Sequence, residues 1–226
     1  MAKFLTILAV GLAAATLGRA GTIAGTVHAV PPAEAPGAPG GGAYDSRRYT
    51  FAEKIDYEHL RDFVVYLDQP VAGAAAAATP LAAVTTQRDA SFDPHVLPVA
   101  VGTTVRWPND DDIYHNVYSE SPVKEFNLNF YKKEKVPEVV FDQVGRVDVF
   151  CAIHAKMHCI VLVLPNAYFV RADAKGRFVL KDVPAGTYKV RAWHERFPSQ
   201  VRTVVVPATG EVRVDFALGL GDLPKY

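Results

Sequence analysis

Three side chains that can bind a metal lie on one short segment of the sequence, at Cys151, His154 and Met157. They offer a thiolate, an imidazole and a thioether at intervals of three residues, between two stretches with the composition of β-strands. A tight loop of this length can wrap all three around one ion. A fourth ligand must come from elsewhere in the chain, and His115, 36 positions before Cys151, is the candidate.

Two imidazoles and a thiolate, with a weak thioether, form the coordination set of electron-transfer copper. Sulfur favours Cu(I), and imidazole accommodates Cu(II), so a frame that suits both states needs little rearrangement when an electron arrives. The sequence therefore predicts one copper ion, the expected cofactor, bound by His115, Cys151, His154 and Met157.

Two other interpretations use some of the same residues. An oxidising compartment favours a disulfide between Cys151 and Cys159, which would make the protein a non-redox binding module. That disulfide would leave the two histidines and Met157 without a role. A structural zinc site would combine Cys151 and the two histidines with His158 or Cys159, but zinc has no use for the thioether of Met157.

Other polar residues give weaker signals. His28, His59 and His95 belong to no cluster in the sequence and are expected to be ordinary surface or hydrogen-bonded residues. His194 is expected to pack at a strand end rather than to support the copper site. The acidic run at 110–112 is interpreted as a plain turn, because it lacks the ligand alternation of a calcium loop.

The elements that must position the ligands are short strands separated by turn signals, which is typical of a β-sandwich or barrel. Pro/Gly-rich residues 31–42 and Ala-rich residues 72–78 are predicted loops. No nucleophile motif, phosphate-binding loop or recognisable carboxylate pair is present, so we expect no enzymatic activity. The predicted strands cover residues 21–27, 61–68, 99–101, 104–107, 138–141, 146–150, 160–164, 169–171, 176–180, 186–193, 201–206 and 212–216.

The first 20 residues have the pattern of a cleaved secretory signal peptide, with Lys3, an apolar run over 4–17 and small residues before the cut. No later apolar run is long enough to span a bilayer, so the expected location is periplasmic or secreted, with no membrane span after cleavage. The chain has 24 basic and 24 acidic residues, and the cleaved form 22 and 24. This balance excludes the strong basic excess of a nucleic-acid-binding protein.

The His-Asn-Val of residues 115–117, followed by the Cys-x-x-His-x-x-Met of residues 151–157, resembles the cupredoxin family, and its spacing is most similar to that of amicyanin. The resemblance covers about residues 91–164 and implies a Greek-key β-sandwich with a type 1 (blue) copper site. It further implies that His115, Cys151 and His154 are equatorial ligands, that Met157 is axial, and that the ring edge of His154 is the electron port.

Residues 165–226 resemble carboxypeptidase regulatory-like modules, which are small prealbumin-like (transthyretin-like) sandwiches without catalysis of their own. The similar segments are Gly176-Arg177-Phe178, 183–188 and 193–195. Residues 21–27 look like the first strand of such a module, so the cupredoxin part is a possible insertion. Residues 21–90 are left open to pair with either sandwich.

Together these observations predict an all-β protein in which a cupredoxin sandwich precedes a regulatory-like sandwich. The expected function is one-electron transfer in the periplasm, with a redox protein such as a c-type cytochrome or a dehydrogenase as partner. The alternative is a copper-delivery protein, for which His158 and Cys159 would offer an exchange route.

Overall fold

The computed structural model describes residues 20–31, 55–71 and 83–220. Every regular element in these ranges is a β-strand, which confirms the predicted all-β class. None of these residues forms a helix with the length and hydropathy needed to cross a bilayer. The predicted signal peptide and the two predicted loops fall outside the described residues, except for Ala20 and Pro31.

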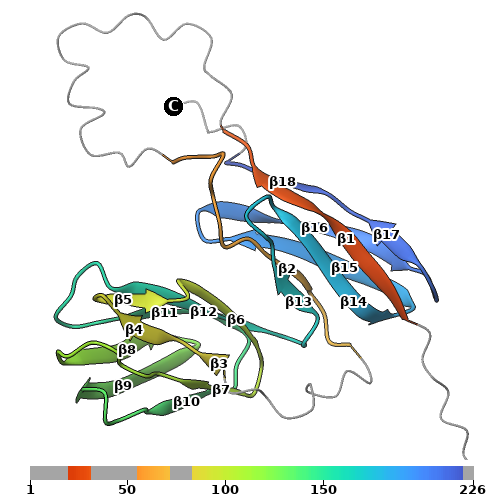
Figure 1. The fold of residues 1–226 in the computed structure, drawn as a ribbon. Helices are drawn as coiled ribbons and strands as arrows, with labels where there is room; N and C mark the ends of the chain where they lie inside the picture. The colour runs from red at the N-terminus through yellow and green to blue at the C-terminus, as the bar shows by residue number, and fades with distance from the viewer. Residues whose placement is uncertain (1–19, 32–54, 72–82, 221–226) are drawn as a thin grey trace, which may run out of the picture.

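Residues 83–164 form one β-sandwich, called the central sandwich here (Figure 1). A three-stranded sheet (β10-β7-β3) faces a five-stranded sheet (β6-β12-β11-β8-β9), and a β4-β5 hairpin lies beside them. The strands are β3 (Ala83–Val84), β4 (Thr86–Arg88), β5 (Ser91–Asp93), β6 (Val96–Ala100), β7 (Thr103–Arg106), β8 (His115–Ser121), β9 (Lys124–Tyr131), β10 (Glu138–Phe141), β11 (Gly145–Phe150) and β12 (His158–Leu164).

The second sandwich, called the split sandwich, combines residues 20–31 and 55–71 with residues 165–220. One sheet has the order β14-β1-β17, with β18 also paired to β1, and the other has the order β13-β2-β15-β16. The strands are β1 (Ala20–Ala29), β2 (Val64–Leu67), β13 (Phe169–Arg171), β14 (Arg177–Pro184), β15 (Gly186–His194), β16 (Phe197–Val206), β17 (Glu211–Arg213) and β18 (Phe216–Leu218).

Strands β1 and β2 are inner strands of the split sandwich, although they come from the beginning of the chain. β1 runs antiparallel to β14 and parallel to β17 and β18, and its residues alternate between buried and less buried positions, as expected for a strand with one face on the core. β2 lies between β13 and β15. The central sandwich is therefore inserted between two strands of the split sandwich.

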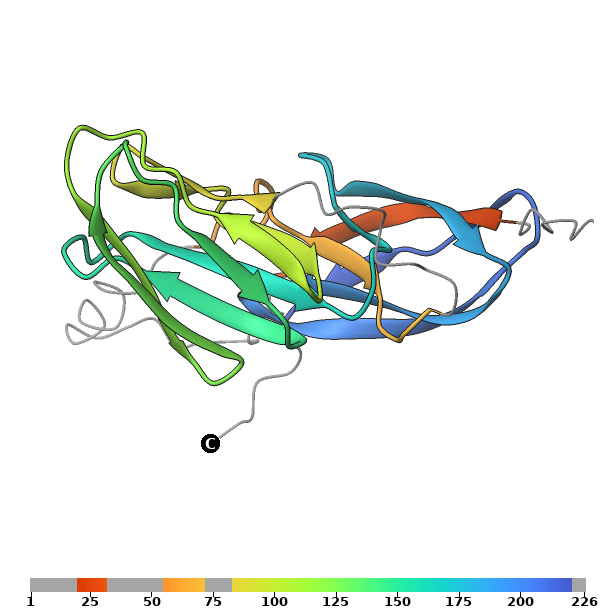
Figure 2. The same ribbon diagram turned by 90° about the horizontal axis from the view of Figure 1, so that it is seen from below.

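The two sandwiches lie along the long axis of the molecule and touch through strands that are buried on both faces (Figure 2). In β12, Cys159 and Val161 face the core of the central sandwich, whereas Ile160 and Leu162 pack against the split sandwich. β2 behaves in the same way, with Val65 directed to its own core. Burial on both faces explains why these strands are continuous hydrophobic runs rather than alternating ones.

The predicted ranges match most strands within a few residues, but no range was predicted for β3, β4, β5, β8 or β9. β9 borders its sheet at the edge and alternates Phe126 and Leu128 with polar residues that remain exposed. Its charged and Asn-rich composition masked the alternation. The predicted strand at 212–216 is two strands, because Val214 leaves the β17 ladder and hydrogen-bonds to the Ala24 carbonyl.

A charged contact fixes β1 to the end of β17, and it predicts a pH effect. Hydrogen bonds from Arg213 and from the side chain and backbone of Thr26 lower the pKa of Asp215 from 3.8 to about 2. The charge of Asp215 should therefore stabilise the fold fully above pH 3.8 and lose this effect as the pH falls towards 2. Asp215→Asn, which mimics the protonated carboxyl, should melt below wild type at pH 7, and the difference should vanish near pH 2. A pH-independent difference in melting temperature would contradict this.

Candidate metal centre

The structure brings His115, Cys151 and His154 together at one end of the central sandwich. The Nδ1 atoms of His115 and His154 are 3.1 Å apart, and the Sγ of Cys151 lies 4.0 Å from the first and 3.7 Å from the second. His115 and Cys151 are buried, whereas His154 is half-buried. Two imidazole nitrogens and a sulfur thus form a small triangle that opens towards the surface at His154.

This triangle has the size that a bound metal ion requires. Bonds of about 2.1 Å to nitrogen and about 2.3 Å to sulfur, in a trigonal plane, would separate the two nitrogens by about 3.6 Å and each nitrogen from sulfur by about 3.8 Å. The distances in the structure agree with these values within about 0.5 Å. The donor set of one soft sulfur and two imidazoles fits copper.

Strand β11 and a closed loop position the ligands near Cys151. Cys151 follows the last residue of β11, and its N–H donates to the carbonyl of Met157 at 3.2 Å. The N–H of Met157 in turn donates to the carbonyl of His154 at 2.9 Å. Met157 is 1% exposed and packs in the same hydrophobic core as Cys151. Met157 is therefore held at the base of the loop that also carries Cys151 and His154.

His115 is the first residue of β8, and a carboxylate fixes its ring. Nε2 of His115 lies 2.8 Å from an oxygen of Asp111. Asp111 is itself held by the backbone N–H groups of Asp89 and Ala90 at 2.8 and 3.0 Å. A ring that donates through Nε2 keeps the lone pair of Nδ1 for a metal, which is the usual carboxylate–histidine–metal arrangement.

Asp111 was not recognised in the sequence, where it was interpreted as part of a plain acidic turn. Burial acts to raise the pKa of its carboxyl, but hydrogen bonds from Ala90, His115 and Asp89 bring that pKa below its ordinary value. The carboxylate therefore stays charged at neutral pH. A sequence signal was present, since Asp111 stands four residues before His115 at a turn that leads into a strand.

We expect Asp111→Asn to weaken copper binding by about 10-fold to 100-fold, because the ring of His115 loses the charged group that fixes its orientation. Competition with a chelator of known affinity measures this change. Asp112→Asn is the matched control, since Asp112 is exposed and pairs with Lys133. Equal copper affinities of the two variants would show that Asp111 does not support the site.

Cys159 and His158, the two other ligand-type residues near the loop in sequence, do not join the centre. Cys151 and Cys159 are both free, so the disulfide interpretation does not describe this structure. Burial raises the pKa of the Cys159 thiol well above its ordinary value, so it stays protonated in the core. The ring of His158 hydrogen-bonds to Asp148 at 2.9 Å. Among the described residues, the four-ligand zinc site with His158 or Cys159 is therefore not assembled.

Two further histidines have definite roles. His194 is buried between Phe63 and Phe197, and burial lowers its pKa, so the structure places it as a packing residue at the end of β15. His95, expected to be an ordinary surface or hydrogen-bonded residue, is hydrogen-bonded, but the fold also places it in a group that the sequence did not indicate. Its ring lies 3.0 Å from a carboxylate oxygen of Glu195, and it groups with His158.

Comparison with known proteins gives a family match for the last part of the chain. Residues 161–219 match the family model of the carboxypeptidase regulatory-like domain. The match covers strands β13 to β18 of the split sandwich. The matched range begins inside β12 and omits β1 and β2, because these two strands come from residues far earlier in the chain. No curated protein sequence matches this chain.

The structural neighbours of the chain are cupredoxins. A purple cupredoxin from Nitrosopumilus maritimus is 27% identical, with 36% of this chain and 98% of that chain covered and a TM-score of 0.34. A mutant of amicyanin in its reduced form is 27% identical over 45% of this chain and 98% of that one, with a TM-score of 0.35. A copper-containing nitrite reductase from Thermus scotoductus is 30% identical over 42% of this chain and 25% of that one, also with a TM-score of 0.35.

Proposed function

We propose that the protein is an exported one-electron carrier with a single type 1 copper ion at His115, Cys151, His154 and Met157. The observation that carries this proposal is the triangle formed by the two Nδ1 atoms and the Sγ of Cys151. A bound copper ion would supply the redox chemistry, by alternating between Cu(I) and Cu(II). No enzymatic activity is proposed, because the centre offers metal ligands rather than a nucleophile with an activating base.

The protein frame keeps the ligands in place during such a change. Asp111 holds the ring of His115, and β11 together with the hydrogen-bonded loop holds Cys151 and Met157. His115 and Cys151 are almost completely shielded from water. A rigid, dry set of ligands changes little between two charge states of the ion, and a small rearrangement makes electron transfer fast.

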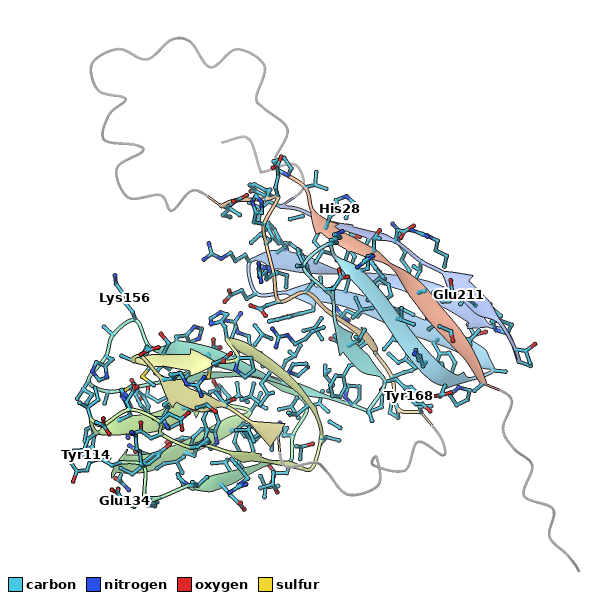
Figure 3. All side chains as sticks on the ribbon, viewed as in Figure 1. His28, Tyr114, Glu134, Lys156, Tyr168 and Glu211 are labelled. Atoms are coloured by element: carbon cyan, nitrogen blue, oxygen red, sulfur yellow. The ribbon has the colours of Figure 1, made fainter. Side chains whose placement is uncertain are left out.

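His154 is the proposed point of electron exchange, because it is the half-buried ligand among otherwise buried ones. Large apolar side chains beside the ligands in sequence are exposed, namely Ile153, Ile113 and Tyr114. Tyr114 and Lys156 both lie at the end of the central sandwich farthest to the left in Figure 3. An exposed apolar surface around a ligand suits brief contact with a redox protein such as a c-type cytochrome or a dehydrogenase.

Redox cycling of the copper-loaded protein tests this function. We expect ascorbate to bleach the visible thiolate-to-copper charge-transfer band and oxidation to restore it over several cycles, with one copper retained per chain. If a chelator removes Cu(I) during the first reduction, the electron-carrier proposal is contradicted and copper delivery is favoured instead. Delivery has less support, because His158 and Cys159, the residues expected to offer an exchange route, are turned to Asp148 and the core.

A further inference from the structure

A second group of ligand-type side chains lies where the two sandwiches meet. His95 directly precedes β6, His158 begins β12, and Glu195 lies in the turn between β15 and β16 (Figure 1). One nitrogen from each ring and one carboxylate oxygen all lie within 4.8 Å of one another. His95 and His158 belong to the central sandwich, and Glu195 belongs to the split sandwich.

Both ring nitrogens of His95 face hydrogen-bond acceptors. Its Nδ1 lies 3.2 Å from the carbonyl oxygen of His158, and its Nε2 lies 3.0 Å from an oxygen of Glu195. Both neighbours are acceptors, but a neutral imidazole has only one N–H. When Nδ1 donates to the carbonyl, the lone pair of Nε2 faces the carboxylate. A proton on Nε2, or a metal ion bonded to both atoms, must then offset their repulsion.

Asp148 and Phe150 hold the ring of His158. Its Nε2 lies 2.9 Å from an oxygen of Asp148, so donation to this carboxylate leaves the lone pair of Nδ1 available. Arg146 pairs with the same carboxylate at 2.7 Å. The ring of Phe150 stacks on the imidazole with the ring centres 4.9 Å apart, which restricts its rotation.

We propose that His95, His158 and Glu195 bind a divalent transition metal ion, such as Zn(II) or Cu(II), at the junction of the two sandwiches. Two imidazoles and a carboxylate are ligands for these ions, and a set without sulfur has no preference for Cu(I). Arg196, whose Nε lies 4.0 Å from Glu195, offsets part of the negative charge. The binding energy therefore comes from the ligand set rather than from net charge.

The proposed site is accessible, and it is distinct from the candidate copper centre at Cys151. The three side chains are partly exposed, and Glu195 also lines a surface cleft of about 350 Å³. His158 directly follows Met157 in the chain, so an ion at the junction would fix the position of the first residue after the ligand loop. The ion would also cross-link His158 to the split sandwich through Glu195.

Zinc stoichiometry in four proteins tests the proposal. Wild type and Cys151→Ala are each prepared with and without Glu195→Gln, and zinc chloride is titrated into the metal-free chains by calorimetry. We expect Glu195→Gln to remove one bound zinc per chain, or to weaken it at least 10-fold, in both backgrounds. The Cys151→Ala background keeps this result independent of the copper centre, so failure of one site does not imply failure of the other.

Glu211→Gln is the matched control, because Glu211 is an exposed glutamate of the same sandwich at the far end from the junction (Figure 3). Zinc binding by Glu195→Gln that equals binding by Glu211→Gln in both number and affinity would overturn the proposal. His95→Gln provides the same comparison from the central sandwich, and circular dichroism spectra verify that each variant is folded. Retention of the zinc by a folded His95→Gln would also overturn it.

Discussion

Cys151→Ser should bind copper without the intense visible band, because that band requires a thiolate bonded to Cu(II). The hydroxyl of Ser is a hard, neutral ligand under these conditions, so the remaining imidazoles would hold copper more weakly and without charge transfer from sulfur. Absorption spectra of equally loaded proteins measure the effect, and we expect the band to disappear completely. If the variant keeps its visible band, Cys151 is not a copper ligand.

Cys159→Ser separates this loss of colour from a general effect of replacing a buried cysteine. Cys159 is 1% exposed in the same core, but its sulfur is not part of the ligand group. Burying a hydroxyl there should cost about 1–3 kcal/mol in the free energy of unfolding while leaving the band in place. The two cysteines should thus affect different measurements, colour for Cys151 and stability for Cys159.

Gly25→Ala should destabilise the split sandwich by about 3 kcal/mol or more, because added atoms in a closely packed site force the backbone apart. A Cβ at Gly25 would lie 1.7 Å from the carbonyl oxygen of Val214 and 3.0 Å from the ring of Phe178. The first neighbour is backbone and cannot turn aside. Urea unfolding, monitored for both sandwiches, measures the loss.

Gly186→Ala is the control in the same sandwich. A Cβ there would approach only the ring of Tyr188, at 3.3 Å, and a side chain can adjust. We expect a change of less than about 1 kcal/mol, since a tolerated Gly→Ala substitution also restricts the unfolded chain. If both variants were equally stable, β1 would not lie against residues 214–216, and its assignment to this sandwich would be wrong.

The grouping of the candidate copper ligands was predictable because most of them lie on a short segment. Cys151, His154 and Met157 lie within seven residues of one another, and a loop of that length leaves few ways to separate them. His115 was found by its residue type and its place before a strand. The sequence could also indicate strands buried on both faces, since 160–164 and 64–67 are unbroken apolar runs.

The junction cluster was not predictable, because it depends on how two sandwiches are packed together. His95 and Glu195 are 100 residues apart, and neither neighbourhood contains a metal-binding motif. The position of β1 was equally open, since a strand pattern specifies a buried face but not the partner strands. The role of Asp111 required the turn geometry that directs one of three adjacent carboxylates to His115.

The insertion of one sandwich within another constrains the order in which the chain can fold. Thr26 pairs with Arg177, so β1 has to wait for a segment about 150 residues later before its ladder can form. The strands of the central sandwich are joined by much shorter connections, and closing short loops costs less entropy. We therefore expect the central sandwich to fold first. Its formation would bring β2 and β13 close enough for the discontinuous half to close around β1.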